Sequence, residues 1–187
     1  VTRSYLQDVD SVVVQFNRPV LMGHSMGGSL TLLYALEKGE RLRGIVLVST
    51  GARLRVNPLI FDLLSSNPEA YVEALAEYMF AKGASSKLIE ASQAEVRKCR
   101  PDVIMRDFTV CNEFDVMSRL NEISLPTLIV VGEEDLMTPV KYAKYMHDRI
   151  KGSELRIVSG AGHSVMLERP TEFNEIVGSW LSRVTET

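Results

Sequence analysis

Short apolar runs alternate with longer helical patterns along this chain of 187 residues, and this alternation limits its fold more than any other feature. Four apolar runs stand out, at residues 19–22, 45–49, 126–131 and 155–158. Strands that are separated by helices can lie parallel in one sheet, with the helices crossing over its faces. The sequence therefore predicts an α/β fold with a mostly parallel sheet flanked by helices.

Helical spacing of apolar residues marks the segments that connect these runs. The first helix is expected at about residues 5–16, and the second at 26–38, where Gly39 closes it. Further helices are predicted at about 139–150 and 170–184.

A long insertion, at about residues 52–123, separates the second and third predicted strands. Its pattern is helical without a convincing strand, and Asn67 marks the start of a helix that includes residues 70–80. The insertion is too long for a connecting loop. We therefore expect a core made of residues 1–51 and 124–187, with residues 52–123 forming a helical lid or cap over the carboxyl edge of the sheet.

The sharpest motif is Gly23-His24-Ser25-Met26-Gly27, because it lies where a strand must turn abruptly into a helix. A G-x-S-x-G sequence in this context is typical of a nucleophile elbow, in which the serine takes up a strained backbone conformation. We expect a Cβ at either glycine to clash across the turn, and the Met26 N–H to face a developing oxyanion. A glycine-rich turn of another α/β protein is the alternative.

A serine hydroxyl needs a base to accept its proton. Of the three histidines, His163 follows a predicted strand in the turn Gly160-Ala161-Gly162, where loops commonly carry chemistry. His24 is expected to pack or to contact substrate, and His147 to lie on a helix surface. We therefore predict that His163 is the base, with an ordinary turn histidine as the alternative.

The base in turn needs an acid to fix its tautomer. Asp135 comes just after the third predicted strand and is the best candidate, with a turn or capping aspartate as the alternative. Glu134 is the nearest substitute. Asp102, Asp107 and Asp115 lie in the insertion and are expected to be solvated.

These motifs resemble those of the α/β-hydrolase fold serine hydrolases, close to the lidded esterases, lipases and cofactor-free perhydrolases. The matching stretches are residues 19–28, 126–139 and 160–170, the last including Gly162-His163 and Glu168-Arg169-Pro170. The resemblance implies the nucleophile, acid, base and one oxyanion donor, which are Ser25, Asp135, His163 and the Met26 N–H. Expected substrate contacts are His24, Met79, Phe80, Phe108, Met137 and Val165. Phe114 and Met117 are further candidates for the lining of the lid, although core packing is an equal alternative for the apolar lid residues.

The chain departs from the family before its first predicted strand. Family members have earlier strands and a loop that supplies a second oxyanion N–H, and no such sequence precedes the helix at residues 5–16. We expect the elbow strand to be an exposed apolar edge. The missing strands are expected from a partner chain, a second copy or a longer parent protein, and the activity of this stretch alone is in doubt.

The leading function is hydrolysis of a small-molecule carboxylic ester through an acyl-enzyme on Ser25. Carbon–carbon bond hydrolysis and perhydrolysis use the same triad and stay open, as does a non-catalytic, hydrolase-like binding protein. Dehalogenases and epoxide hydrolases are disfavoured because they need a carboxylate in place of Ser25.

Composition excludes several other classes. The net charge is −3 and the basic residues are scattered, which argues against nucleic-acid binding. No apolar run approaches the roughly 20 residues that span a bilayer. Cys99 and Cys111 lack the spacing of a zinc site and are expected to be reduced, with a disulfide between them as the alternative. We predict neither a metal nor a cofactor. The absence of a signal peptide favours the cytoplasm, although a targeting segment ahead of Val1 would not be visible.

Overall fold

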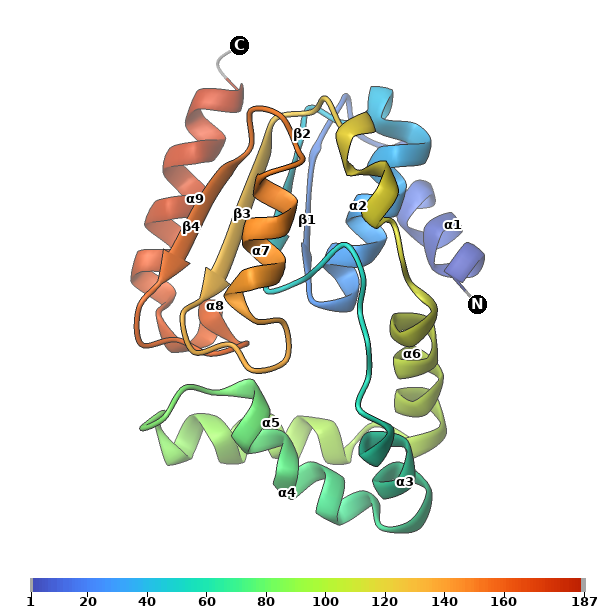
Figure 1. The fold of residues 1–187 in the computed structure, drawn as a ribbon, viewed down its shortest axis with the longest axis vertical. Helices are drawn as coiled ribbons and strands as arrows, with labels where there is room; N and C mark the ends of the chain where they lie inside the picture. The colour runs from blue at the N-terminus through green and yellow to red at the C-terminus, as the bar shows by residue number, and fades with distance from the viewer. Residues whose placement is uncertain (1, 186–187) are drawn as a thin grey trace.

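A computed structural model of the chain describes residues 2–185, and it contains the predicted parallel sheet (Figure 1). The strands are β1 (Val20–His24), β2 (Gly44–Val48), β3 (Thr127–Gly132) and β4 (Glu154–Val158). They are hydrogen-bonded in the order β1-β2-β3-β4, and all neighbouring pairs are parallel. The carboxyl ends of all four strands therefore meet at one edge.

Helices cover both faces of this sheet. They are α1 (Thr2–Val13), α2 (Met26–Lys38), α7 (Val140–His147) and α9 (Pro170–Thr185). Successive side chains of a strand point to opposite faces. Ile45 and Leu47 of β2 pack in a core with α1, α2 and α7, whereas Val46 and Val48 pack against Trp180 and its neighbours on α9.

The insertion between β2 and β3 is helical, as predicted. Its elements are α3 (Pro58–Ser66), α4 (Pro68–Met79), α5 (Ser86–Arg97), α6 (Pro101–Glu113) and the 3-10 helix η2 (Met117–Glu122). The side chains of Asn57 and Asn67 cap α3 and α4 by accepting hydrogen bonds from main-chain N–H groups at 3.1 and 3.2 Å. Figure 1 shows α3, α4 and α5 beyond the ends of the strands toward which the arrows point. These helices thus lie at the carboxyl edge of the sheet.

Several boundaries differ from those that the sequence predicts. β1 continues to His24 rather than ending at residue 22, and α7 ends at His147 rather than near residue 150. Gly39 does not adopt a left-handed capping conformation; its φ is −57° and it begins the short 3-10 helix η1 (Gly39–Arg41). A further helix, α8 (Val165–Glu168), has only four residues and was not predicted.

The outer side of β1 is exposed, as expected. Within residues 2–185, β1 pairs with β2 alone, and Met22 on β1 has 52% of its surface exposed.

Candidate active site

Ser25 occupies a strained turn between β1 and α2. Its backbone has φ 51° and ψ −117°, in a region that a residue with a side chain rarely adopts. Two contacts hold this turn against the end of β2, because the Ser25 N–H donates to the Val48 carbonyl at 2.9 Å and the Thr50 hydroxyl donates to the Ser25 carbonyl at 2.8 Å. Such strain persists only where the surroundings impose it, and it occurs often at functional sites.

The glycines around Ser25 are not equivalent. A Cβ on Gly23 would lie 2.1 Å from the Gly27 carbonyl oxygen, and one on Gly28 would lie 2.6 Å from Thr50 Cγ2. A Cβ on Gly27 would meet no atom of residues 2–185 within 4 Å, apart from its two chain neighbours and the nearby backbone of its own helix. The expected steric need for glycine therefore holds at Gly23, is not found at Gly27, and applies also at Gly28.

Asp135 and His163 form a buried pair at the same edge. His163 Nδ1 lies 3.0 Å from Asp135 Oδ2 and 3.1 Å from Oδ1, and the two residues are only 2% and 3% exposed. Thr138 completes the pair, since its N–H and its hydroxyl donate to the two carboxylate oxygens at 2.8 Å each. Burial by itself would raise the pKa of Asp135, but the hydrogen bonds from His163 and Thr138 outweigh it and lower that pKa.

His24 is a further contact of His163. Its Nε2–H donates to the His163 carbonyl at 3.0 Å, and the centroids of the two rings are 4.7 Å apart. Burial, followed by the proximity of His163, lowers the pKa of His24 to about 4. The His24 ring is therefore neutral at pH 7 and packs on His163.

The three residues of the expected triad thus lie at one edge of the sheet, with different degrees of contact. Asp135 and His163 are hydrogen-bonded, whereas Ser25 is linked to them only by sequence, as the neighbour of His24, whose ring contacts that of His163. Within residues 2–185, the Ser25 hydroxyl forms no hydrogen bond, and its side chain lines a pocket. The Met26 N–H opens α2, where the first N–H groups of a helix have no carbonyl partner within that helix.

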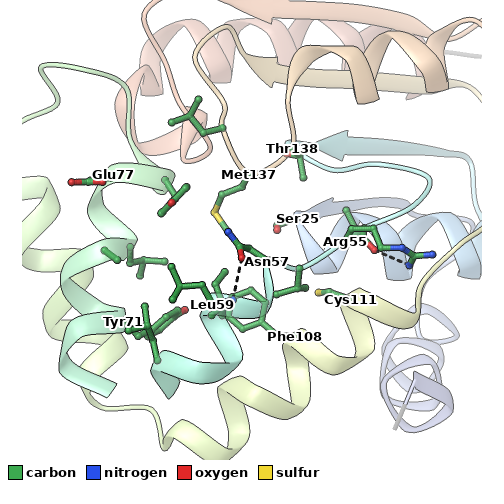
Figure 2. A pocket seen from close by; sticks show the side chains of 18 residues that line it. Ser25, Arg55, Asn57, Leu59, Tyr71, Glu77, Phe108, Cys111, Met137 and Thr138 are labelled. Atoms are coloured by element: carbon green, nitrogen blue, oxygen red, sulfur yellow. Dashed lines mark hydrogen bonds between the residues drawn. The ribbon is translucent and has the colours of Figure 1, made fainter. Parts of the chain in front are cut away.

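The pocket has a volume of about 450 Å³ and reaches from Ser25 into the insertion. Figure 2 shows its side chains around Ser25, with those of α3, α4 and α6 on the insertion side and Met137 and Thr138 near the sheet. Its lining consists of Ser25, Leu54, Arg55, Val56, Asn57, Leu59, Ile60, Leu63, Tyr71, Ala74, Leu75, Glu77, Tyr78, Phe108, Cys111, Leu136, Met137 and Thr138. Most of these side chains are apolar or aromatic, which suits an uncharged substrate chain.

Two of the six expected substrate contacts, Phe108 and Met137, line this pocket. The other four are found elsewhere: His24 packs on His163, Met79 packs within the insertion, and Phe80 and Val165 are buried.

The further lid candidates also lie outside the pocket. Phe114 is buried in the main core, and Met117 lines a separate hollow with Lys141 and Tyr142.

Several pocket residues were missed by the sequence analysis. Leu59, Ile60 and Leu63 recur at helical steps on α3, and Tyr71 and Leu75 do so on α4. This spacing identifies an apolar helix face, but it does not say whether that face meets a pocket or another helix.

The pocket holds a second candidate nucleophile, Cys111. Burial, followed by the nearby Asp107, raises the pKa of the Cys111 thiol to about 11. A thiol with such a pKa is protonated at neutral pH and is a poor nucleophile. Ser25, at the same sheet edge as the buried Asp135–His163 pair, is the better candidate.

Other candidates have different partners. Glu134, the substitute acid, accepts a hydrogen bond from the Lys82 N–H at 3.1 Å. His147 ends α7, and its Nδ1 lies 2.9 Å from the Ser153 hydroxyl. Cys99 and Cys111 are free, the first exposed and the second buried.

Clusters of potential metal ligands and membrane-spanning helices are both absent from residues 2–185. No group of three or more potential metal ligands gathers there. Nor does any helix in that part of the chain have both the length and the apolar character that a membrane crossing requires.

Known proteins that are similar to this chain include several hydrolases. A family model described as "Alpha/beta hydrolase family" matches residues 1–176. A solved thermophilic esterase is 36% identical with a TM-score of 0.90, over 98% of this chain and 73% of that chain. A proline iminopeptidase of Saccharolobus solfataricus is 27% identical, over 96% of this chain and 67% of its own. A pimeloyl-[acyl-carrier protein] methyl ester esterase of Neisseria meningitidis is 22% identical, over 95% of this chain and 62% of its own.

Proposed function

The chain belongs to the alpha/beta hydrolase family, and we propose that it hydrolyses carboxylic esters through an acyl-enzyme formed on Ser25. The observation that carries this proposal is the buried Asp135–His163 pair at the sheet edge where the strained Ser25 opens into an apolar pocket. An esterase as a structural neighbour at 36% identity supports the same chemistry.

The proposal gives each group a role in the first half of the reaction. Because Asp135 holds His163 Nδ1, the ring presents Nε2 as the base. The Ser25 hydroxyl oxygen attacks the ester carbonyl while Nε2 accepts its proton. The tetrahedral intermediate then collapses, its carbon–oxygen bond to the alcohol breaks, and His163 returns the proton to that alcohol.

Water completes the cycle. His163 accepts a proton from water as the water oxygen attacks the acyl carbon, and the bond to Ser25 breaks as His163 returns the proton to the Ser25 oxygen. In both halves the Met26 N–H, at the start of α2, is the proposed donor to the oxyanion. One such donor is typically worth about 10²- to 10³-fold in rate.

The proposal gives the insertion, residues 52–123, the role of a lid. Its helices α3, α4 and α6 supply most of the pocket wall beyond Ser25, so the lid shapes the site for the acyl or alcohol chain. The apolar lining favours an uncharged chain.

Amide hydrolysis is the second candidate, since the chain is 27% identical to a proline iminopeptidase. The same acyl transfer applies, with an amine rather than an alcohol as the leaving group. Turnover of proline nitroanilide that exceeds turnover of nitrophenyl esters would favour this candidate.

Nitrophenyl ester turnover tests the proposal. We expect a burst of nitrophenol from nitrophenyl butyrate, followed by steady turnover, and we expect Ser25→Ala to remove both. Ser182→Ala, on α9, is the control and should behave like the wild type. Equal turnover by wild type and Ser25→Ala would exclude Ser25 as the nucleophile, and no turnover by either would favour a binding protein.

A further inference from the structure

We propose that Glu168 is a positioning residue that fixes the His163 loop and the pocket wall relative to each other. This inference rests on the proposed function of the site. It starts from a carboxylate at the end of α8 that contacts two segments far apart in the sequence.

Glu168 joins these segments through their main chains. Its Oε1 accepts the Gly162 N–H at 2.8 Å, and its Oε2 accepts the Ala81 N–H at 2.7 Å. We call this meeting of residues 162–164 with residues 79–81 the junction. A third hydrogen bond joins it, because the Ser164 N–H donates to the Met79 carbonyl at 3.0 Å. The end of α4 is thereby attached on both sides of His163.

The junction is tight as well as polar. A Cβ on Gly162 would lie 2.6 Å from the Ala81 nitrogen and 2.7 Å from the Phe80 carbonyl carbon. Phe80 and Ala81 are themselves buried, at 6% and 8% exposure. Buried N–H groups need acceptors, and water has little access to provide them here.

A carboxylate suits this position better than an amide. It has two acceptor oxygens and no donor, so it can serve two N–H groups at once. The side chain in Glu168→Gln has one acceptor oxygen and one NH₂ group. Whichever way that amide turns, one main-chain N–H faces another donor.

The consequence at the catalytic edge concerns His163. Asp135 fixes its ring, His24 contacts its carbonyl, and Glu168 fixes the N–H of the preceding residue, Gly162. Without the Glu168 carboxylate, the Gly162 N–H loses its acceptor and the backbone before His163 can move, while the His163 ring stays hydrogen-bonded to Asp135. We therefore expect a slower chemical step.

The consequence at the pocket concerns α4. Tyr71, Leu75 and Tyr78 of this helix line the pocket, and α4 ends at Met79, two residues before Ala81. A released Ala81 lets this wall move away from Ser25. Long acyl chains contact the wall more than acetate does, so the KM for long esters should rise.

Glu168→Gln tests the proposal, with Glu172→Gln as the matched control. Glu172 is exposed in the first turn of α9, and its substitution removes the same charge. We would measure kcat and KM for nitrophenyl acetate and hexanoate, counting active sites with a fluorophosphonate. Amide hydrogen exchange at Gly162 and Ala81 would be followed in the same proteins.

The expected result is a roughly tenfold lower kcat per active site for both esters, which corresponds to about 1.4 kcal/mol of lost transition-state stabilisation. KM should rise for hexanoate more than for acetate, and Gly162 or Ala81 should exchange faster. Glu172→Gln should match the wild type in every measurement.

A merely structural role would lower the number of active sites while leaving kcat per site and both KM values unchanged, and that result would overturn the proposal. If Glu168→Gln does not fold, Glu168→Asp decides the matter: it keeps the charge but is one methylene shorter, so wild-type kinetics and exchange would also overturn it.

Failure of the proposed function looks different. In that case the wild type itself would not hydrolyse esters, whereas faster exchange at Gly162 or Ala81 in Glu168→Gln would still report the junction.

Discussion

At the scale of single residues, the buried Asp135–His163 pair depends on groups other than its two members. Thr138 occupies both Asp135 oxygens, and its hydroxyl also lies 3.3 Å from His163 Nδ1. Charge-assisted hydrogen bonds of this kind contribute more than neutral ones. Thr138 therefore keeps Asp135 ionised and correctly oriented in a buried site.

His24 should make folding stability depend on pH. Its pKa is about 4 in the folded chain and about 6.5 when unfolded. Between these values the unfolded chain binds more protons, so the free energy of unfolding falls as the pH drops through this window, by at most about 1.4 kcal/mol per pH unit. The lowered pKa of Asp135 affects the free energy of unfolding only at pH values below this window.

Urea unfolding between pH 4.5 and 7 checks this prediction. His24→Gln should show a shallower pH dependence than the wild type, because its amide does not titrate. Parallel pH profiles for the two proteins would show that His24 is not the group responsible.

Some site residues can be predicted from the sequence and others cannot. Asp135 and His163 were predicted because each follows a strand, and parallel strands end at a common edge; the structure brings the two together. Thr138 and Glu168 fall in the family-like stretches, but no role was predicted for either, because their partners depend on how the loops fold back. No spacing rule links Glu168 to Ala81, which lies 87 residues away.

At the scale of elements, the strand-to-helix turn at Ser25 is constrained by both its neighbouring strand and its own helix. Its backbone is held by β2 through Val48 and Thr50, and Gly23 lies directly under the first turn of α2. The position of Ser25 is thus set by the sheet.

The two glycines that flank Ser25 should respond differently to alanine. Gly23→Ala places a Cβ 2.1 Å from a backbone oxygen, so we expect it to cost about 3 kcal/mol or more, or to prevent folding. The Cβ in Gly27→Ala meets no atom of residues 2–185 within 4 Å beyond its chain neighbours and the nearby backbone of its own helix, so this variant should change stability by about 1 kcal/mol or less. Thermal and urea unfolding of both variants give the comparison. Equal losses would contradict this account of the turn.

The order of strands and helices could be predicted because short apolar runs alternate with helical spacing along the sequence. The bounds of α2 agree with those predicted. The helix α8 could not be predicted, because four residues carry no periodicity. Its last residue, Glu168, is tied to Gly162 and Ala81, so its place depends on tertiary contacts. The residue at which a helix ends, such as His147 in α7, depends on local packing in the same way.

At the scale of the whole molecule, the pocket lies between the sheet and the insertion. The sequence predicted a helical segment at this edge, yet not which of its faces would line the pocket. Ala74 and Ala76 both lie on α4, but Ala74 lines the pocket and Ala76 does not. Only the packing of α4 against its neighbours distinguishes them.

Ala74→Phe should therefore shorten the preferred acyl chain. The larger side chain fills space that a hexanoyl group would occupy, and each methylene kept out of the pocket forfeits about 0.8 kcal/mol, or roughly fourfold in kcat/KM. The measurement is the ratio of kcat/KM for nitrophenyl hexanoate and acetate. Ala76→Phe is the control and should keep the wild-type ratio. A similar fall in both variants would place the acyl chain elsewhere.

The central claim is that Ser25 is an activated nucleophile, and covalent labelling by a fluorophosphonate followed by peptide mass spectrometry tests it most directly. We expect one adduct, on Ser25, which His163→Ala slows by at least about 10²-fold, the usual scale for a lost general base. No adduct, an adduct on another residue, or labelling unaffected by His163→Ala would contradict the account.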